Sequence, residues 1–204
     1  MEFAQSNFSR VQPPKTVSNS NSSRASDVTP SNRKKICEQI KQSADHVLKD
    51  TWVLWGHLPH DTDWTIKSYI KIMEFNTLEN MIALYRNIPE AMVKNCMLFL
   101  MRKNIMPIWE DKKNKNGGCF SFKVTNKSVP KIWKQMSYVL AGNTLTKDAK
   151  FANNINGITI SPKKSFCIMK IWVSNTLVQH PRKLVLVKGL NQNGCLFKKH
   201  KPEY

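Results

Sequence analysis

The stretch IMPIWEDKKNKNGG, residues 105–118, places an indole beside a carboxylate at the mouth of a basic loop. An apolar run leads into Trp109 and Glu110, lysines and asparagines follow them, and a glycine pair closes the loop. Because Trp109 lies between Pro107 and a charged segment, where a chain turns, its flat face is expected to be open to solvent.

Short strand patterns flank this loop on both sides. Runs of β-branched and aromatic residues between turn residues predict strands at 51–55, within 66–75, and at 96–101, 119–124, 156–161, 165–173 and 182–187. These strands follow one another too closely for crossover helices, so the pattern predicts a single antiparallel sheet of the α+β class.

Two segments show helical spacing instead. In residues 76–88, Asn76 is the expected N-cap with Glu79 completing a capping box, and residues 128–142 read as a helix from Ser128 to Gly142. The apolar faces of these helices consist of Leu78, Met81, Ile82 and Tyr85, and of Ile132, Trp133, Met136, Val139 and Leu140. Both helices are expected on one face of the sheet.

The 204 residues suit one domain with a tail. Residues 1–45 are rich in Ser, Asn, Pro and Thr and predict a disordered or partly helical tail, with a short helix considered over 33–50; the domain is expected over 46–204. Five scattered cysteines fit reduced thiols, and the sequence lacks a membrane-length apolar run and a signal-peptide pattern. A cytoplasmic monomer is therefore predicted. The basic runs 33–35 and 198–201 read as solvated charge, or as nuclear-import signals or RNA contacts, so a nuclear location stays open.

Charge and tryptophans point to nucleic acid. The chain has 32 Lys and Arg against 14 Asp and Glu, a formal net charge of +18, which suits a polyanion. Of the six tryptophans, Trp52, Trp55 and Trp133 fit core positions, whereas Trp64 and Trp109 occur where the chain turns. An exposed indole pair on a basic protein is suited to stacking a nucleobase.

Glu110 narrows the choice of base. Guanine presents two adjacent donors on one edge, and a single carboxylate accepts both. If the base is also cationic, each indole face attracts it further, by about 0.5–2 kcal/mol. Trp64, Trp109 and Glu110 together therefore suit a positively charged guanine.

With these residues in view, the chain resembles the eukaryotic translation initiation factor 4E family, which binds the 7-methylguanosine cap of mRNA. The resemblance runs from about His46 to Trp172 and resumes at 181–187. It rests on TWVLW (51–55), Trp64, FNTLENMIALYRNI (75–88), IMPIWEDKKNKNGG (105–118), VPKIWKQMSYVLAG (129–142) and NGITISPKKSFCIMKIW (156–172). The chain reads as a divergent, shortened member, as in a virus or an early-branching eukaryote.

The resemblance implies a strongly curved sheet with helices on its convex face and a cap slot on its concave face. Trp64 and Trp109 would sandwich the methylated base, Glu110 would hold its donor edge, and Trp172 would touch the methyl group. Lys163 would meet the triphosphate, with Lys164 and Lys170 as further cations. Cys119, Phe120 and Ile168 depart from the family's basic and aromatic pattern there.

The resemblance also implies a protein partner, a scaffold or a repressor that presents a helix to the convex face. The corresponding positions are His46, Val47, Leu78, Ile82 and Tyr138. Ile82 stands where the family has a tryptophan, so a co-diverged or noncognate partner is expected.

Three alternatives stay open. The chain acts in translation initiation, or it is a cap-binding translational repressor of the same fold, or it is a general single-stranded RNA-binding protein without cap preference. An enzyme is the weaker reading. His57, His60, Asp61 and Asp63 are of metal-ligating types, but the sequence shows no further ligand cluster and no recognisable nucleophile motif. Binding without catalysis, metal or cofactor is predicted.

Overall fold

Seven antiparallel strands form one sheet in the computed structural model, which describes residues 45–200. The strands are β1 (Val47–His57), β2 (Ile70–Thr77), β3 (Met97–Arg102), β4 (Gly118–Thr125), β5 (Ile155–Pro162), β6 (Phe166–Val173) and β7 (Leu196–Lys199). Their order across the sheet is β2-β1-β3-β5-β6-β4-β7, and all the paired neighbours run antiparallel. Together with the helices, this confirms the predicted α+β class.

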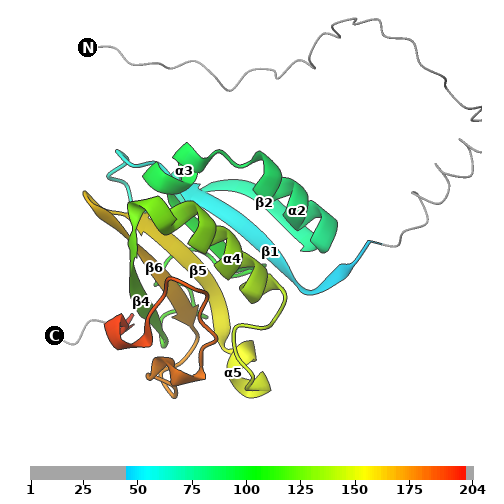
Figure 1. The fold of residues 1–204 in the computed structure, drawn as a ribbon, viewed down its shortest axis with the longest axis vertical. Coiled ribbons are helices and arrows are strands. Elements are labelled where there is room, and N and C mark those ends of the chain that lie inside the picture. The colour runs from blue at the N-terminus through cyan, green and yellow to red at the C-terminus, as the bar shows by residue number, and fades with distance from the viewer. Residues whose placement is uncertain (1–44, 201–204) are drawn as a thin grey trace, which may run out of the picture. The chain divides into compact units, whose positions relative to one another are not determined.

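Four helices accompany the sheet within residues 45–200: α2 (Leu78–Asn87), α3 (Glu90–Asn95), α4 (Val129–Ala141) and α5 (Ala149–Asn153). Short 3₁₀ turns occur at Ile66–Ser68, Asn126–Ser128, Pro181–Lys183 and Gln192–Gly194. Figure 1 shows α2, α3 and α4 on one side of the sheet. The larger hydrophobic core lies between these helices and the sheet, as the apolar stripes predicted.

Strand alternation divides the side chains between two faces. Leu98 and Leu100 of β3 belong to the core under the helices, whereas Phe99 and Met101 belong to a smaller cluster with Ile105 and Trp172. Trp55, Tyr69 and Met97 pack around that second cluster. The face opposite the helices therefore carries its own aromatic surface.

The predicted strand over 182–187 and the predicted cap at Asn76 are wrong. Residues 181–183 form a 3₁₀ turn and the rest is irregular, in keeping with Pro181, while β7 supplies the strand that pairs with β4. Thr77 is the N-cap of α2, accepting from the Asn80 N–H, because the Glu79 carboxylate is bound to His46 instead.

The short helix considered over 33–50 is wrong where it can be examined, because Val47–Asp50 belong to β1, paired with β2. Its remaining residues lie almost entirely outside the described part, as does the predicted tail, so the boundary at 45/46 stays a prediction. Within residues 45–200, no helix is long and apolar enough to cross a membrane.

Candidate functional site

Two loops expose a tryptophan side chain to solvent, as predicted. Trp64 follows β1 and is 57% exposed, and Trp109 follows β3 and is 44% exposed. The other tryptophans are more enclosed, with Trp52 and Trp133 in the main core and Trp55 against the second cluster. A large apolar ring that stays exposed to water gains free energy when another flat group covers it. These two positions are therefore suited to a planar ligand.

His57 lies directly against Trp64. The imidazole and indole planes differ by 4°, and their centroids are 4.3 Å apart. His57 itself is 1% exposed, and its Nδ1 and Nε2 lie 3.0 Å and 2.9 Å from the carbonyl oxygens of Leu58 and Asp63. One face of Trp64 is therefore supported by the protein.

A chain of ring contacts runs from this pair across the sheet. The Tyr69 ring lies 5.1 Å from His57 and 5.3 Å from Phe99, and Phe99 lies 6.5 Å from Trp172, all in edge-to-face or steeply inclined arrangements. Such contacts favour a fixed mutual geometry. These ring contacts link two of the predicted ligand tryptophans, Trp64 and Trp172, through residues of the second cluster.

Glu110 is tied electrostatically to the same group of rings. Burial, and next the negative charge of Glu110, raise the pKa of the Tyr69 phenol. A carboxylate exerts such an effect on a phenol only from nearby, because surface charges are screened over about 8–10 Å. The negative charge of Glu110 thus acts on a ring that contacts His57, the residue against which Trp64 stacks.

Buried amide hydrogen bonds hold the Trp109 loop, in addition to the apolar contact of Ile105 with the second cluster. Asn114 is fully buried and its Nδ2 donates to the carbonyl oxygens of Met106 and Ile108. The Asp111 carboxylate accepts from the backbone N–H groups of Met106 and Lys113. Sequence reasoning missed this role, although Asn and Asp are the residues that most often bond to nearby backbone in turns.

The glycine pair at the end of the loop serves close packing. A Cβ on Gly117 would lie 1.8 Å from the carbonyl oxygen of Val173, and one on Gly118 would lie 2.6 Å from the carbonyl oxygen of Lys198. Only glycine lets β6 and β7 approach the start of β4 this closely.

Trp172 is less open than the other two predicted ligand tryptophans. It is 7% exposed, its indole N–H donates to Thr159 Oγ1 at 2.7 Å, and the His200 ring lies 4.6 Å away. His200 donates through Nδ1 to the Asn114 carbonyl oxygen, so it also touches the Trp109 loop. Burial, and to a lesser extent the charge of Lys170, lower the pKa of His200.

The three predicted phosphate lysines are spread along the β5–β6 hairpin. Lys170 shares a strand face with Trp172, two residues away on β6. Lys163 and Lys164 lie in the β5–β6 turn, and the six strand positions from Phe166 to Trp172 span roughly 20 Å. Lys198 was noted in the sequence only as part of the basic run 198–201; in the sheet it pairs opposite Cys119, the residue that also pairs with Trp172.

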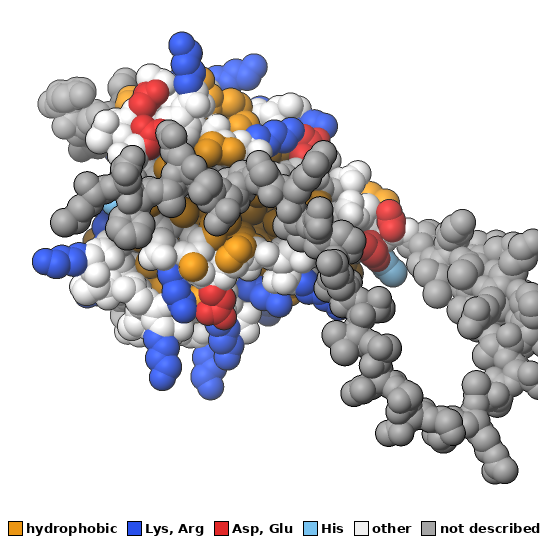
Figure 2. All heavy atoms as spheres, turned by 90° about the horizontal axis from the view of Figure 1, so that it is seen from above, with side chains coloured by type: hydrophobic (Ala, Val, Ile, Leu, Met, Phe, Trp, Pro, Cys, Tyr) orange, Lys and Arg blue, Asp and Glu red, His pale blue; other side chains and the backbone are white. Residues whose placement is uncertain are grey.

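The surface of the molecule carries many basic side chains. Figure 2 shows Lys and Arg side chains around the periphery of one face of the molecule, with hydrophobic side chains between them. Such a surface attracts polyanions from solution.

The predicted partner residues lie close together at the start of the domain and on the helices. His46 bonds to Glu79 of α2 through its backbone N–H and its ring, and its carbonyl accepts from the Leu78 N–H. Val47 and Leu78 are exposed and Ile82 is partly buried. Tyr138 of α4 contacts α2 through the Tyr85 ring, at 5.5 Å. We call His46, Val47, Leu78, Ile82 and Tyr138 the helix-side patch.

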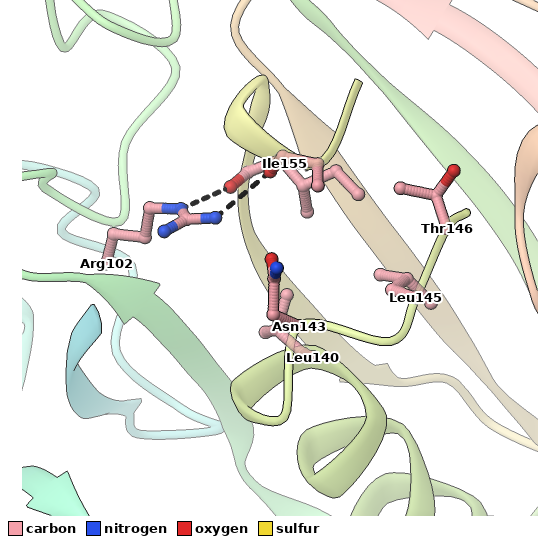
Figure 3. Close-up of a pocket in the computed structure, with 7 residues that line it drawn as sticks. Arg102, Leu140, Asn143, Leu145, Thr146 and Ile155 are labelled. Carbon is pink, nitrogen blue, oxygen red and sulfur yellow. Dashed lines mark hydrogen bonds between the residues drawn. The ribbon is translucent and has the colours of Figure 1, made fainter. Parts of the chain in front are cut away.

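Two other places in the described part of the chain are unsuited to a metal ion or a ligand. Within residues 45–200, His, Cys, Asp and Glu form no group arranged to hold a metal ion, and both His57 ring nitrogens face carbonyl oxygens. The cavity beside Arg102 measures about 10 Å³, enough for one water at most. Figure 3 shows that its arginine is already committed, donating to the carbonyl oxygens of Ala152 and Ile155.

The family model described as "Eukaryotic initiation factor 4E" matches residues 47–200. A eukaryotic translation initiation factor 4E homolog of Acanthamoeba polyphaga mimivirus is 44% identical over 62 residues, 30% of this chain and 23% of the relative. Eukaryotic translation initiation factor 4E of Eremothecium gossypii is 29% identical over 140 residues, 64% of this chain and 63% of the relative. The chain thus spans less than two thirds of the length of these two relatives.

Solved structures share the fold. Ascaris suum eIF4E-3, in complex with the m7G cap, has a TM-score of 0.60 and 21% identity, over 67% of this chain and 77% of that one. Schistosome eIF4E, in complex with m7GpppG and 4E-BP, has a TM-score of 0.56 and 23% identity, over 64% and 73%. At these identities the likeness establishes the fold alone.

Proposed function

Because the chain belongs to the eukaryotic initiation factor 4E family, we propose that it binds the 7-methylguanosine cap of mRNA and acts in translation initiation. Members of this family are binding factors without enzymatic activity, in agreement with the prediction that the chain is no enzyme. The relative from Ascaris suum, solved with the m7G cap, supports the same ligand for this chain.

The observation that carries this proposal is the pair of solvent-exposed indoles, Trp64 in the loop after β1 and Trp109 beside Glu110 in the loop after β3. Trp64 stacks on His57, His57 contacts Tyr69, and Tyr69 is affected by the charge of Glu110, the neighbour of Trp109. Both indoles are open to solvent. In the proposed complex, Trp64 and Trp109 enclose the base from its two faces, and Glu110 accepts from its ring N–H and its exocyclic amine.

The proposed slot should bind a methylated guanine more tightly than an unmethylated one. A 7-methylated guanine is cationic, so it gains from the negative faces of both indoles and from the Glu110 carboxylate, by about 0.5–2 kcal/mol per indole contact. Trp172 lies at the far end of the ring chain, where we propose that its exposed edge meets the methyl group. The slot would lie on the concave face of a strongly curved sheet, with the helices on its convex face.

For the cap phosphates we propose Lys170 and Lys198, which lie on the same sheet face as Trp172. Lys198 would supply the cation that Cys119 does not. Lys163 and Lys164 are proposed for phosphates farther from the base, because the β5–β6 turn lies roughly 20 Å along β6 from Trp172.

We propose that the helix-side patch docks a helix from a scaffold or repressor protein. A groove of this kind suits an amphipathic helix, and the patch offers exposed apolar side chains at Val47 and Leu78. Relatives solved with 4E-BP or with the 4E-binding protein Mextli support a partner of this class. The identity of the partner decides between an activator and a translational repressor.

A titration with 7-methyl-GTP and GTP tests the function. Tryptophan quenching is followed at low and at physiological salt, where cap recognition predicts tighter binding of the methylated nucleotide at both. Affinity for uncapped RNA should fall steeply with salt, with a log–log slope of about −0.7 per phosphate contacted. Equal binding of the two nucleotides would favour the general single-stranded RNA binder instead.

A further inference from the structure

We propose that His57 is a positioning residue for Trp64: its ring clamps the first and last carbonyl groups of the loop 58–63 and holds Trp64 ready for stacking, and this clamp is complete only when the imidazole is protonated. The inference rests on the proposed function insofar as Trp64 is a ligand residue. The clamp itself is a property of the ligand-free protein.

The geometry of the clamp is set by three contacts of a buried ring. Nδ1 lies 3.0 Å from the Leu58 carbonyl oxygen, and Nε2 lies 2.9 Å from the Asp63 carbonyl oxygen. The face of the ring lies parallel to the Trp64 indole. One side chain therefore fixes both ends of the loop and supports the indole that follows it.

The protonation argument follows from the donor count. A carbonyl oxygen only accepts, and a neutral imidazole donates through one nitrogen while the other presents a lone pair. In the neutral ring, one of the two contacts would place a lone pair against a carbonyl oxygen inside the protein, where an unsatisfied polar group is costly. The imidazolium donates to both oxygens.

The surroundings of the ring contribute few competing charges. Tyr69 packs edge-on against it, and Glu110 acts on Tyr69. The loop carboxylates are used locally, since Asp61 accepts from the Asp63 N–H and Asp63 accepts from Thr65. His60 lies in the same loop and is exposed. The two carbonyl oxygens are therefore the hydrogen-bond partners of the His57 ring.

The clamp predicts that Trp64 becomes less ordered as pH rises. As pH rises and the ring loses a proton, one hydrogen bond is lost, the loop 58–63 loosens, and Trp64 becomes less ordered. A protonated His57 also places a positive charge behind Trp64, which repels a cationic base in front of it. Affinity alone would mix these two effects, so the decisive measurement is made without ligand.

The experiment is an NMR titration of the full chain from pH 5.5 to 8.5, following the ring nitrogens of His57 and the indole N–H of Trp64. At the low end, we expect protons on both His57 nitrogens and a sharp Trp64 signal. As His57 loses a proton, the Trp64 signal should shift and broaden with the same midpoint. A Trp64 signal that stays unchanged while His57 titrates, or a His57 ring with one proton throughout, would overturn the proposal.

A variant pair gives an independent test. His57→Phe keeps a flat ring under Trp64 but removes both donors, and His60→Phe makes the same change at the exposed histidine of the loop. We expect a broadened, pH-independent Trp64 signal in H57F and a wild-type titration in H60F. A sharp Trp64 signal in folded H57F would contradict the clamp, and if H57F does not fold, the wild-type titration decides. Failure of 7-methyl-GTP to bind would refute the proposed function while leaving this result intact.

Discussion

The Asn156 side chain donates through Nδ2 to Asn114 Oδ1 at 2.8 Å, joining β5 to the buried centre of the Trp109 loop. The same Nδ2 donates to the Lys113 carbonyl oxygen, and Asn114 passes the connection on to Met106 and Ile108. An indole and a carboxylate can therefore project from a basic loop because its backbone is fixed from within by amide hydrogen bonds.

Asn114→Ala should weaken both the fold and the cap site. The change takes the Asn114 donor from the Met106 and Ile108 carbonyl oxygens and leaves Asn156 Nδ2 with the Lys113 carbonyl oxygen as its remaining acceptor, which should lower the free energy of unfolding by about 1–3 kcal/mol. Affinity for 7-methyl-GTP should fall as Trp109 loses its support. Denaturant unfolding and tryptophan quenching measure the two effects. Asn116→Ala, in the exposed part of the same loop, is the control and should change neither.

Glu110→Gln tests the guanine edge. The glutamine amide has one acceptor oxygen in place of two and carries no charge, and its NH₂ group meets a donor of guanine unfavourably. Affinity for 7-methyl-GTP should therefore fall by about 1–3 kcal/mol, or about five- to 150-fold. Isothermal titration measures the loss. Glu90→Gln on α3 makes the same change on an exposed helix and should bind normally. Normal affinity in E110Q would remove Glu110 from the site.

The lysine assignments predict that salt affects the affinity of each variant differently. Lys170→Ala and Lys198→Ala should each flatten the dependence of 7-methyl-GTP affinity on salt, and Lys163→Ala should do so less, because the β5–β6 turn lies roughly 20 Å along β6 from Trp172. For a longer capped RNA, Lys163→Ala should reduce the log–log slope by about 0.7 if it contacts one phosphate. Identical slopes for all three variants would mean that the lysines act only through total charge.

Much of the sheet could be predicted because its strands carry clear local patterns. β6 is a nearly continuous apolar run with Lys170 as its one charged residue, and the structure buries every second side chain of it under the helices, at Cys167, Met169, Ile171 and Val173. The short elements were missed for the opposite reason. β7 has four residues, of which Phe197 alone packs into the core, and α3 and α5 are too short to show a helical period.

The exposed indoles of the candidate site were predictable, but the supports behind them were not. Trp64 and Trp109 stand out in the sequence because they interrupt polar, turn-forming segments. His57 was read as a metal-ligating type, since the sequence does not reveal that its loop folds back so that two carbonyl oxygens occupy its nitrogens. His200 and Lys198 come near Trp172 only through the pairing of β7 with β4, which depends on the whole sheet.

Ile82→Asp tests the helix-side patch. Ile82 is partly buried on α2, beside the exposed Leu78, so a charge there should abolish binding of a helical partner and leave 7-methyl-GTP affinity unchanged. Pull-down with a candidate scaffold or repressor peptide, followed by nucleotide titration, separates the two activities. Leu177→Asp places the same charge at an exposed apolar side chain elsewhere and should retain the partner. Loss of nucleotide binding in I82D would assign Ile82 to the core instead.

Acid should weaken the domain through Glu74. Hydrogen bonds from Lys103 and Lys71 lower the pKa of this β2 carboxyl to about 2, below the model-peptide range that it regains on unfolding. A carboxyl with a depressed folded-state pKa stabilises the fold above its unfolded pKa, and that stabilisation disappears as pH falls from about 4.5 toward 2. Glu74→Gln should therefore lower Tm at pH 6 and show a shallower decline of Tm between pH 5 and 2, measured by circular dichroism. Glu90→Gln is the matched control, because the exposed Glu90 carboxylate forms an ion pair with Lys94 within α3. A wild-type acid profile in E74Q would show that the Glu74 ion pairs do not contribute to folding.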